Sequence, residues 1–302
     1  MDGFINILKP PGMTSHDVVA WLRKLFNYQK IGHAGTLDPG AAGVLPVALG
    51  KGTRLLEYLL NDDKSYRFEI VFGIQTTTQD LDGEIVTRRS VTKDQLKQLP
   101  AILEEFEGEI LQVPPMVSAV RVRGKRLYDL ARQGVRVERP PRRVVISKLD
   151  LLETRFRDPP FTALLDVECS KGTYIRTLCH DIGNRMGCGA SLSFLLRTKT
   201  ASFGLDRAWT LEDIQANWEA GQRDFLCAPG EVLSFPVVLV GREVEKDIRQ
   251  GKQVPLAGIS HQLSLTGDGQ LVQAVDEKGL VAIAEIQYRK EGYYLQPRKV
   301  LR

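Results

Sequence analysis

Residues 32–45 place a single carboxylate in a tight, glycine-rich segment. Its sequence is Gly-His-Ala-Gly-Thr-Leu-Asp-Pro-Gly-Ala-Ala-Gly-Val-Leu, with His33 five positions before Asp38 and Pro39 directly after it. Glycine allows close backbone approach and positive φ, whereas proline fixes its own φ and pushes the preceding residue toward an extended conformation. Such a loop can present one carboxylate to a bulky substrate in a fixed geometry. On composition alone, a plain turn with an Asx hydrogen bond is the favoured interpretation.

The rest of the chain predicts the elements that would position this segment. Thr14 and Asp17 are spaced for a capping box, and apolar residues then follow at helical spacing. Hydrophobic periodicity predicts, in chain order, a helix over 15–28, a helix over 53–60, a strand over 66–72, a helix over 92–106, a strand over 163–169 and a helix over 175–187. Because strands and helices are mixed without regular βαβ alternation, we expect an α+β domain.

A second, smaller domain is expected after residues 226–236, which contain Cys-Ala-Pro-Gly and Ser-Phe-Pro. Beyond this boundary, short apolar runs alternate with glycine-bearing turns, at 237–240, 271–275, 280–286 and 293–295. That spacing predicts a small all-β barrel of about 70 residues.

Length and composition are those of an ordinary globular protein. A chain of 302 residues favours two domains, and 43% apolar with 26% charged residues is typical of a soluble protein. No apolar run approaches the roughly 20 residues that cross a bilayer. The first five residues lack the basic and then apolar pattern of a signal peptide, so a cytoplasmic location is expected.

Positive charge gathers in one segment, residues 118–145. It holds nine basic and two acidic residues, a local excess of +7 against +4 for the whole chain. The basic residues are Arg121, Arg123, Lys125, Arg126, Arg132, Arg136, Arg139, Arg142 and Arg143. Such a run is most often a solvated surface, and it also suits binding to phosphates.

Several other chemistries lack the residues they need. The four cysteines form no CxxC pair, and Cys179, His180 and Cys188 lack paired ligand spacing, so free thiols and no metal site are expected. Residues 50–53, Gly-Lys-Gly-Thr, do not meet the spacing of an ATP phosphate loop. Neither HxE nor PCxxC occurs, which excludes a zinc nucleobase deaminase.

Two carboxylates, Asp80 and Asp82, follow a run of three threonines. A pair of this kind could serve as a glycosidase acid and base. Ordinary turn chemistry explains them equally well, and we assign them no proton transfer.

Three motifs together resemble one family. They are Leu-Lys-Pro-Pro-Gly-Met-Thr-Ser at 8–15, the Asp38 segment, and Cys-Ser-Lys-Gly-Thr-Tyr-Ile-Arg at 169–176. In this order they resemble the bacterial tRNA pseudouridine synthases of the TruB family, which modify uridine 55 in the T-loop, from about Gly3 to the C-terminus. The resemblance implies a mixed-sheet catalytic domain over 1–231 containing a basic RNA-binding insert over 118–145, and a PUA-like RNA-binding barrel over 232–302.

The same resemblance implies a reaction and its catalytic residues. Uridine becomes pseudouridine when the C1′–N1 bond breaks, the base turns and C5 bonds to C1′. No electrons enter or leave, so neither a cofactor nor a metal is expected. The resemblance places the essential carboxylate at Asp38, its cationic partner at Arg176 and an active-site aromatic at Tyr66. Without the motifs, Arg176 would be a helix-surface arginine and Tyr66 a core aromatic.

Further residues are implied to bind the substrate. His33 would fill the gap that a flipped-out base leaves in the T-loop, with a core or capping histidine as the alternative. The others are Tyr174, which packing under the sheet explains nearly as well, Leu195, Leu196 and Arg197 in the family's third motif, and Lys9, which would brace the Asp38 loop.

The implied partner is tRNA, bound by a monomer without an obligate protein partner and without a membrane. The basic insert would close on the T-arm, chiefly through Arg121, Arg123, Lys125, Arg126, Arg132, Arg142 and Arg143. The C-terminal barrel would contact the acceptor stem or serve as a structural cap. Two alternatives remain: a non-catalytic chaperone of tRNA folding, and a guide-RNA-dependent synthase, which the long basic insert disfavours.

Overall fold

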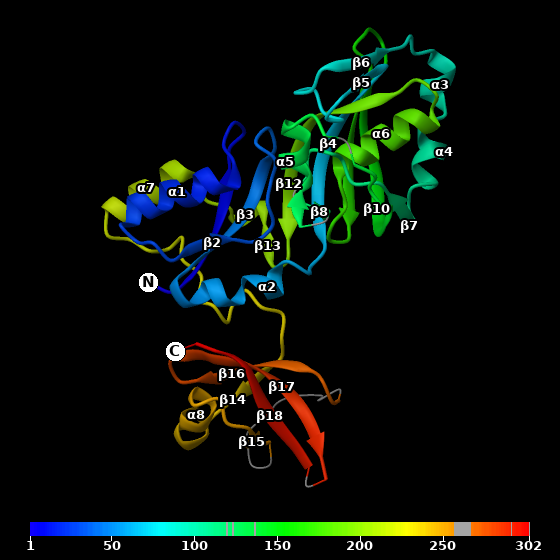
Figure 1. Ribbon diagram of the computed structural model, residues 1–302. Coiled ribbons are helices and arrows are strands. Elements are labelled where there is room, and N and C mark those ends of the chain that lie inside the picture. The colour runs from blue at the N-terminus through cyan, green and yellow to red at the C-terminus, as the bar shows by residue number, and fades with distance from the viewer. Residues whose placement is uncertain (119, 123, 136, 257–266, 291, 302) are drawn as a thin grey trace.

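A computed structural model gives the fold of the chain and describes all residues except 119, 123, 136, 257–266, 291 and 302. Figure 1 shows a larger part built around a long mixed sheet and a smaller C-terminal part below it, joined by the segment that follows α7. No helix in the described part is long and apolar enough to cross a membrane.

Within the described residues, the larger sheet has nine strands, seven of them in the order β1-β3-β12-β4-β11-β10-β7. The two remaining strands are β2, which pairs with β3, and β13, which pairs with β12. These strands are β1 (Gly3–Lys9), β2 (Ile31–His33), β3 (Ala42–Leu49), β4 (Lys64–Phe72), β7 (Gly108–Gln112), β10 (Arg142–Arg155), β11 (Thr162–Cys169), β12 (Ala190–Thr200) and β13 (Phe203–Gly204). β3 and β12 run parallel, and all other pairs in this sheet are antiparallel.

Helices and two small hairpins cover this sheet and connect its strands. They are α1 (Ser15–Phe26), η1 (Gly50–Leu55), α2 (Leu56–Leu59), β5 (Ile74–Thr76), β6 (Ile85–Arg88), α3 (Lys93–Lys97), α4 (Leu99–Glu104), β8 (Arg121–Val122), β9 (Lys125–Arg126), α5 (Leu127–Arg132), α6 (Ile175–Arg185), η2 (Leu205–Arg207) and α7 (Leu211–Glu219). One apolar core joins α1 and α7 to β1 and β3, and another joins α4 and α6 to β4, β10 and β11.

The predicted capping box at the start of α1 is confirmed. The Thr14 hydroxyl accepts a hydrogen bond from the Asp17 amide at 3.0 Å, and the Asp17 carboxylate accepts one from the Thr14 amide at 2.8 Å. The helix ends at Asn27, which adopts the left-handed conformation with φ 47°. Local signals therefore fix both ends of the helix that precedes the Asp38 loop.

The single helix expected over 92–106 is instead two short helices, α3 and α4. Pro100 lies in the first turn of α4, and a proline there has no N–H to continue the ladder of α3. The apolar residues keep their expected side, because Leu96, Leu99, Ile102 and Leu103 are all buried in the core beside α6.

In its described residues, the C-terminal part is a five-stranded sheet in the order β14-β16-β17-β18-β15, with one helix, α8. Its elements are β14 (Val237–Leu239), α8 (Arg242–Arg249), β15 (Val254–Pro255), β16 (Leu271–Asp276), β17 (Gly279–Arg289) and β18 (Gly292–Val300). It packs on η1 and α2 through the perpendicular rings of Tyr58 and Phe235 and an ion pair between Lys299 and Glu57 at 2.7 Å. The mixed α+β fold with a curled C-terminal β sheet agrees with the sequence prediction.

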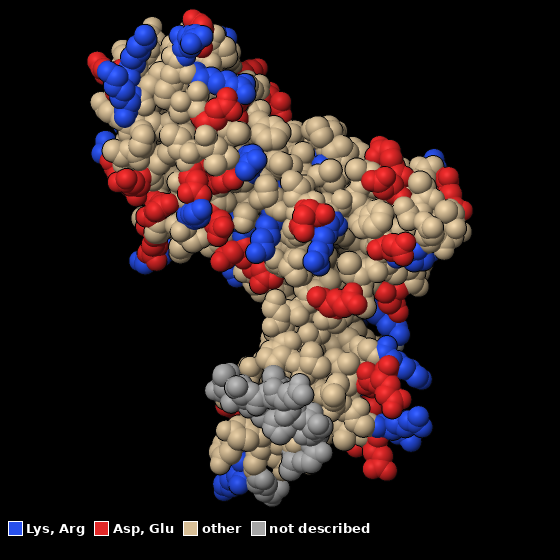
Figure 2. All heavy atoms as spheres, turned by 180° about the vertical axis from the view of Figure 1, so that it is seen from behind, with Lys and Arg blue, Asp and Glu red and all other residues tan. Residues whose placement is uncertain are grey.

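Charges of both signs are interspersed on the side of the molecule seen in Figure 2. Exposed ion pairs join neighbouring strands. One example is the pair between Arg67 of β4 and Asp166 of β11, at 2.8 Å. A mixed surface of this kind presents no broad positive field to a polyanion.

Candidate active site

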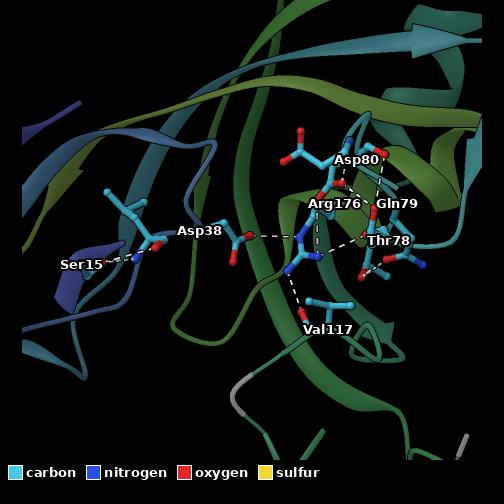
Figure 3. Close-up of polar contacts among 10 residues, drawn as sticks. Ser15, Asp38, Thr78, Gln79, Asp80, Val117 and Arg176 are labelled. Atoms are coloured by element: carbon cyan, nitrogen blue, oxygen red, sulfur yellow. Dashed lines mark hydrogen bonds and ion pairs between the residues drawn. The ribbon is translucent and has the colours of Figure 1, made fainter. Parts of the chain in front are cut away.

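Asp38 lies in the loop between β2 and β3, close to where β3 meets β12. Two hydrogen bonds tie this loop to the start of α1: the Leu37 amide donates to the Ser15 hydroxyl at 2.9 Å, and that hydroxyl donates to the Leu37 carbonyl at 3.3 Å. Leu37 and Ala41 are buried on either side of the aspartate. The backbone on both sides of the carboxylate is therefore anchored, and Figure 3 shows its side chain directed across to Arg176.

The buried side chain of Lys9 supports the same loop through hydrogen bonds to backbone carbonyls. Its side chain is fully buried, and its ammonium donates to the carbonyls of Pro10 at 2.8 Å, Met13 at 2.6 Å and Pro39 at 3.2 Å. Burial lowers the pKa of Lys9 to about 8, although Asp38 opposes that change. The group therefore stays mostly charged at pH 7 and satisfies three carbonyls at once, one of them directly after Asp38.

We expect Lys9→Met to lower the free energy of unfolding by about 2 kcal/mol, because three buried carbonyls lose their donor. Urea denaturation at pH 7 measures this change. The control is Lys97→Met, because Lys97 is exposed, with 76% of its side chain accessible, and pairs with exposed Asp94 on the same helix. Equal stability of the two variants would contradict the bracing role.

Arg176 connects the Asp38 loop to two other segments, the turn at residues 78–80 and the chain at Val117. Its Nε lies 3.0 Å from the Asp38 carboxylate, and its Nη1 lies 3.5 Å from Asp80 and donates to the Thr78 carbonyl at 3.2 Å. Its Nη2 donates to the Val117 carbonyl at 2.8 Å. Figure 3 shows these partners arranged around one guanidinium group. With only 5% of the Arg176 side chain exposed, its geometry is held from all sides.

The ionisation of Asp38 depends on its pairing with Arg176. Burial is the main cause that raises the pKa of Asp38 above its ordinary value, and Asp80 adds to the rise. Arg176 is the largest opposing influence, followed by Lys9. The Asp38 side chain is nevertheless 47% exposed, so water can reach the carboxylate. Arg176 therefore helps to keep the carboxylate ionised.

A cavity of about 110 Å³ opens beside the carboxylate. Asp38, Asp80 and Arg176 form its polar wall, and Phe194 and Leu195 are among its apolar lining. An anionic group thus lies in a small space that also has apolar lining. This arrangement suits a flat ring attached to a group on which positive charge develops.

Tyr66 and Arg197 lie next to the Asp38 loop, but neither is among the residues that line the cavity beside Asp38. Tyr66 is 8% exposed, and its hydroxyl is hydrogen-bonded to Arg197. Burial raises the pKa of Tyr66, and Arg197 opposes the rise. Arg197 also donates to the carbonyls of Val44 at 2.7 Å and Gly35 at 2.9 Å, on either side of Asp38. The predicted Arg197 therefore supports both the tyrosine and the loop.

Gly43 allows the backbones of β3 and β12 to approach closely at Arg197. Its φ is +114°, and a Cβ there would lie 2.2 Å from the Arg197 carbonyl oxygen. Only glycine fits where β3 meets β12, so the glycines of the segment have a structural reason.

The other expected substrate-binding residues lie around this centre. His33 ends β2, and its Nδ1 is buried with no partner among the described residues. Burial lowers the pKa of His33, so the ring is neutral at pH 7. Tyr174 is the N-cap residue of α6. Leu195 lines the cavity, whereas Leu196, half-buried and paired with Ala42 across β12 and β3, is not among the lining residues.

The basic residues divide between the insert and the sheet. Arg142 and Arg143 begin β10, where both are exposed, and Arg143 pairs with Glu109 at 2.7 Å. Arg123 lies outside the described residues. The structure gives the remaining four by backbone alone, on β8, β9 and α5: Arg121, Lys125, Arg126 and Arg132.

The resemblance to the family places Asp80 near the site, and its carboxylate lies 3.5 Å from Nη1 of Arg176. Sequence reasoning missed two other contributors. It did not foresee the Val117 carbonyl, and it gave no role to Phe194, which lines the cavity with 44% of its surface exposed. The sequence could have indicated Phe194, because a bulky aromatic stands beside the Leu195 motif. Backbone carbonyls leave no such signal.

Comparison with known proteins identifies the family. Residues 23–175 match the family model described as TruB family pseudouridylate synthase, N-terminal domain, and residues 176–228 match tRNA pseudouridylate synthase B C-terminal domain. The chain belongs to the TruB family. TruB relatives of similar length include tRNA pseudouridine synthase B of Moorella thermoacetica, 47% identical over 99% of each chain, and that of Pelotomaculum thermopropionicum, 44% identical over 100% of this chain and 97% of the relative.

Solved structures share the TruB fold along nearly the whole chain. A Cbf5–Nop10–Gar1 complex contains a chain that is 30% identical, with a TM-score of 0.75, over 99% of this chain and 85% of the other. An H/ACA ribonucleoprotein bound to a substrate RNA containing 2′-deoxyuridine gives the same TM-score at 28% identity over the same shares. The five-stranded C-terminal sheet lies beyond the matched family models but within these structural alignments.

Proposed function

We propose that this chain converts uridine 55 in the T-loop of tRNA to pseudouridine, without a cofactor. The observation that carries the proposal is the Asp38 carboxylate, held 3.0 Å from Arg176 at the edge of a cavity, in a member of the TruB family. Relatives that match along their full length are named tRNA pseudouridine synthase B, which supports tRNA as the substrate.

The geometry suits the steps of this isomerisation. When the C1′–N1 bond breaks, positive charge develops on the ribose, and the Asp38 carboxylate is placed to stabilise it. The freed base turns within the cavity that Leu195 lines, and C5 then bonds to C1′. The C5 proton leaves to water, and N1, which left C1′ with the bonding electrons, takes up a proton. Because burial raises the pKa of Tyr66, its hydroxyl stays neutral, and we assign the ring to contact with the base.

The target base must first leave the stack of the T-loop, which costs a few kcal/mol. We assign His33 to fill the gap, because its ring is neutral and one nitrogen is unpartnered among the described residues. Residues 1–231 would form the catalytic domain, the basic insert over 118–145 would bind the T-arm, and the PUA-like domain over 232–302 would bind the acceptor stem. The chain would act as a cytoplasmic monomer.

One assay tests this function. A T-arm hairpin with tritium at C5 of the target uridine is incubated with the protein, and label released to water is counted. We expect release to approach one equivalent per hairpin, because C5 loses its proton only when the new bond forms. A matched hairpin labelled only in stem uridines should release none. A protein that binds the hairpin but releases no label would be an RNA chaperone rather than a synthase.

Binding to the T-arm should depend steeply on salt, because lysine and arginine displace counterions from phosphates. We expect the Kd to rise on the order of 10³-fold between 50 and 200 mM salt. Arg143→Gln should lower the slope of log Kd against log salt by about one. The matched control is Arg155→Gln at the other end of β10, where Arg155 is likewise exposed and paired with a glutamate. A flat response, or equal slopes for both variants, would contradict the proposed role of the insert.

A further inference from the structure

Gln112 stands where the connection between β7 and β10 leaves the main sheet. It is the last residue of β7, and it pairs in register with Arg142, the first residue of β10. The connection between β7 and β10, residues 113–141, therefore begins and ends at this pair of residues, and it contains most of the insert. The Gln112 side chain is not directed to solvent, because the residue is only 1% exposed.

The side-chain amide of Gln112 forms two hydrogen bonds to the backbone of one residue, Tyr174, at the start of α6. Its Oε1 accepts a hydrogen bond from the Tyr174 amide at 3.0 Å, and its Nε2 donates to the Tyr174 carbonyl at 3.3 Å. Tyr174 is the N-cap of α6, and no side chain caps that helix. A primary amide is suited to this position, because it presents one donor and one acceptor together, which a carboxylate or an apolar group does not.

The helix start determines where Arg176 can reach. Arg176 is the second residue of α6, and side chains in the first turn point back toward the helix N-terminus. The β7–β10 connection contacts the same side chain directly, because Nη2 of Arg176 donates to the carbonyl of Val117, the residue just before the insert. A shift of Tyr174 relative to β7 would thus move the guanidinium away from both Asp38 and Val117.

We propose that Gln112 is a positioning residue for Arg176, fixing the start of α6 so that the guanidinium meets the Asp38 carboxylate. This inference rests on the proposed function. Because Gln112 lies where the β7–β10 connection leaves the sheet, it also links the proposed RNA-binding segment to Asp38 and Arg176. It contacts neither the cavity nor the expected path of the base.

The first test replaces the amide by an apolar group of similar length, Gln112→Met. We expect kcat for tritium release to fall about ten- to hundred-fold, because small misplacements at a reacting centre have effects of this size. The KM for the hairpin should change by less than about threefold, since the RNA-binding surface is kept. The acidic limb of the pH–rate profile should move to higher pH, because Asp38 loses part of its cationic partner.

The matched control is Gln273→Met in the C-terminal sheet. Gln273 is 2% exposed, and its Nε2 donates to the carbonyls of Leu233 at 3.1 Å and Phe235 at 2.9 Å. It therefore shares the burial of Gln112 and also donates to backbone carbonyls, although its Oε1 has no partner among the described residues, and it lies in the C-terminal sheet rather than beside Asp38. Gln273→Met should lower thermal stability while leaving kcat and the pH profile unchanged.

A double-mutant cycle with Arg176→Ala, followed by single-turnover release over hours, separates positioning from general damage. If Gln112 acts through Arg176, adding Gln112→Met to Arg176→Ala should change the rate by less than about twofold. Multiplicative losses, or a wild-type kcat in Gln112→Met, would overturn the inference.

Circular dichroism checks that each variant is folded. Should Gln112→Met fail to fold, Gln112→Asn takes its place, because it keeps the amide but cannot reach Tyr174. Absence of label release by the wild type would instead reject the proposed function itself.

Discussion

Asp38→Asn should lower the rate of C5 tritium release at least about 10³-fold, while the Kd for the T-arm hairpin changes by less than about threefold. The amide keeps the size and shape of the side chain, so the loop anchored by Ser15 and Lys9 is preserved. It carries no negative charge, so it cannot balance the charge that develops on the ribose. Single-turnover release and filter binding on the same hairpin measure the two quantities.

The matched control for this change is Asp82→Asn. Asp82 lines the same cavity but forms no ion pair with Arg176 among the described residues, in contrast to Asp38 and Asp80. We expect its release rate to stay within a few-fold of the wild type. Undiminished release by Asp38→Asn would show that another group performs the chemistry, and Asp80 would then be the first candidate.

Local features of this chain could be predicted from the sequence, because the residues that produce them lie within a few positions of one another. The capping box of Thr14 and Asp17 depends on a spacing of three, and the strand at 66–72 shows its alternation directly. The pairing of Asp38 with Arg176, in contrast, could not be predicted from residues close together in the chain. The two residues are far apart in the chain, and only the resemblance to a family brought them together before the structure did.

Two long strands, β10 and β12, were not predicted, for a physical reason. Register shifts interrupt β10 between Ile146 and Lys148 and again between Leu151 and Glu153, and β12 between Leu192 and Phe194. Each bulge adds a residue and exchanges the faces of the residues that follow, so the period of two is lost from the sequence. In β12 the shift directly precedes Phe194 and Leu195, which line the cavity, so irregular pairing coincides with the site.

The contacts that organise Arg176 were also beyond sequence reasoning. The carbonyls of Thr78 and Val117 accept hydrogen bonds from its guanidinium. Gln112 acts indirectly, because its side chain accepts a hydrogen bond from the amide of Tyr174, at the start of the same helix. A backbone carbonyl is present at every position, and only the fold determines which one meets a guanidinium group. The resemblance could therefore bring Asp38 and Arg176 together as candidate site residues, whereas the groups that position Arg176 could not be predicted.

Arg176→Ala should lower kcat about 10²- to 10³-fold and move the acidic limb of the pH–rate profile to higher pH. Asp38 must be ionised to act. Burial and Asp80 raise its pKa, and Arg176 is the largest influence that lowers it. Without Arg176 the pKa rises further, so a higher pH is needed for the same ionised fraction. The loss of kcat should persist above that limb, because the carboxylate is no longer aimed.

The control on the same helix is Arg185→Ala, because Arg185 is exposed and pairs with Glu105 at 2.7 Å, away from the cavity. It should leave both kcat and the acidic limb unchanged. The two effects of Arg176→Ala are separable, since a purely structural arginine would lower kcat at every pH by the same factor. A fall in kcat with an unmoved acidic limb would therefore keep Arg176 as an anchor for the loop but remove its role in holding Asp38 ionised.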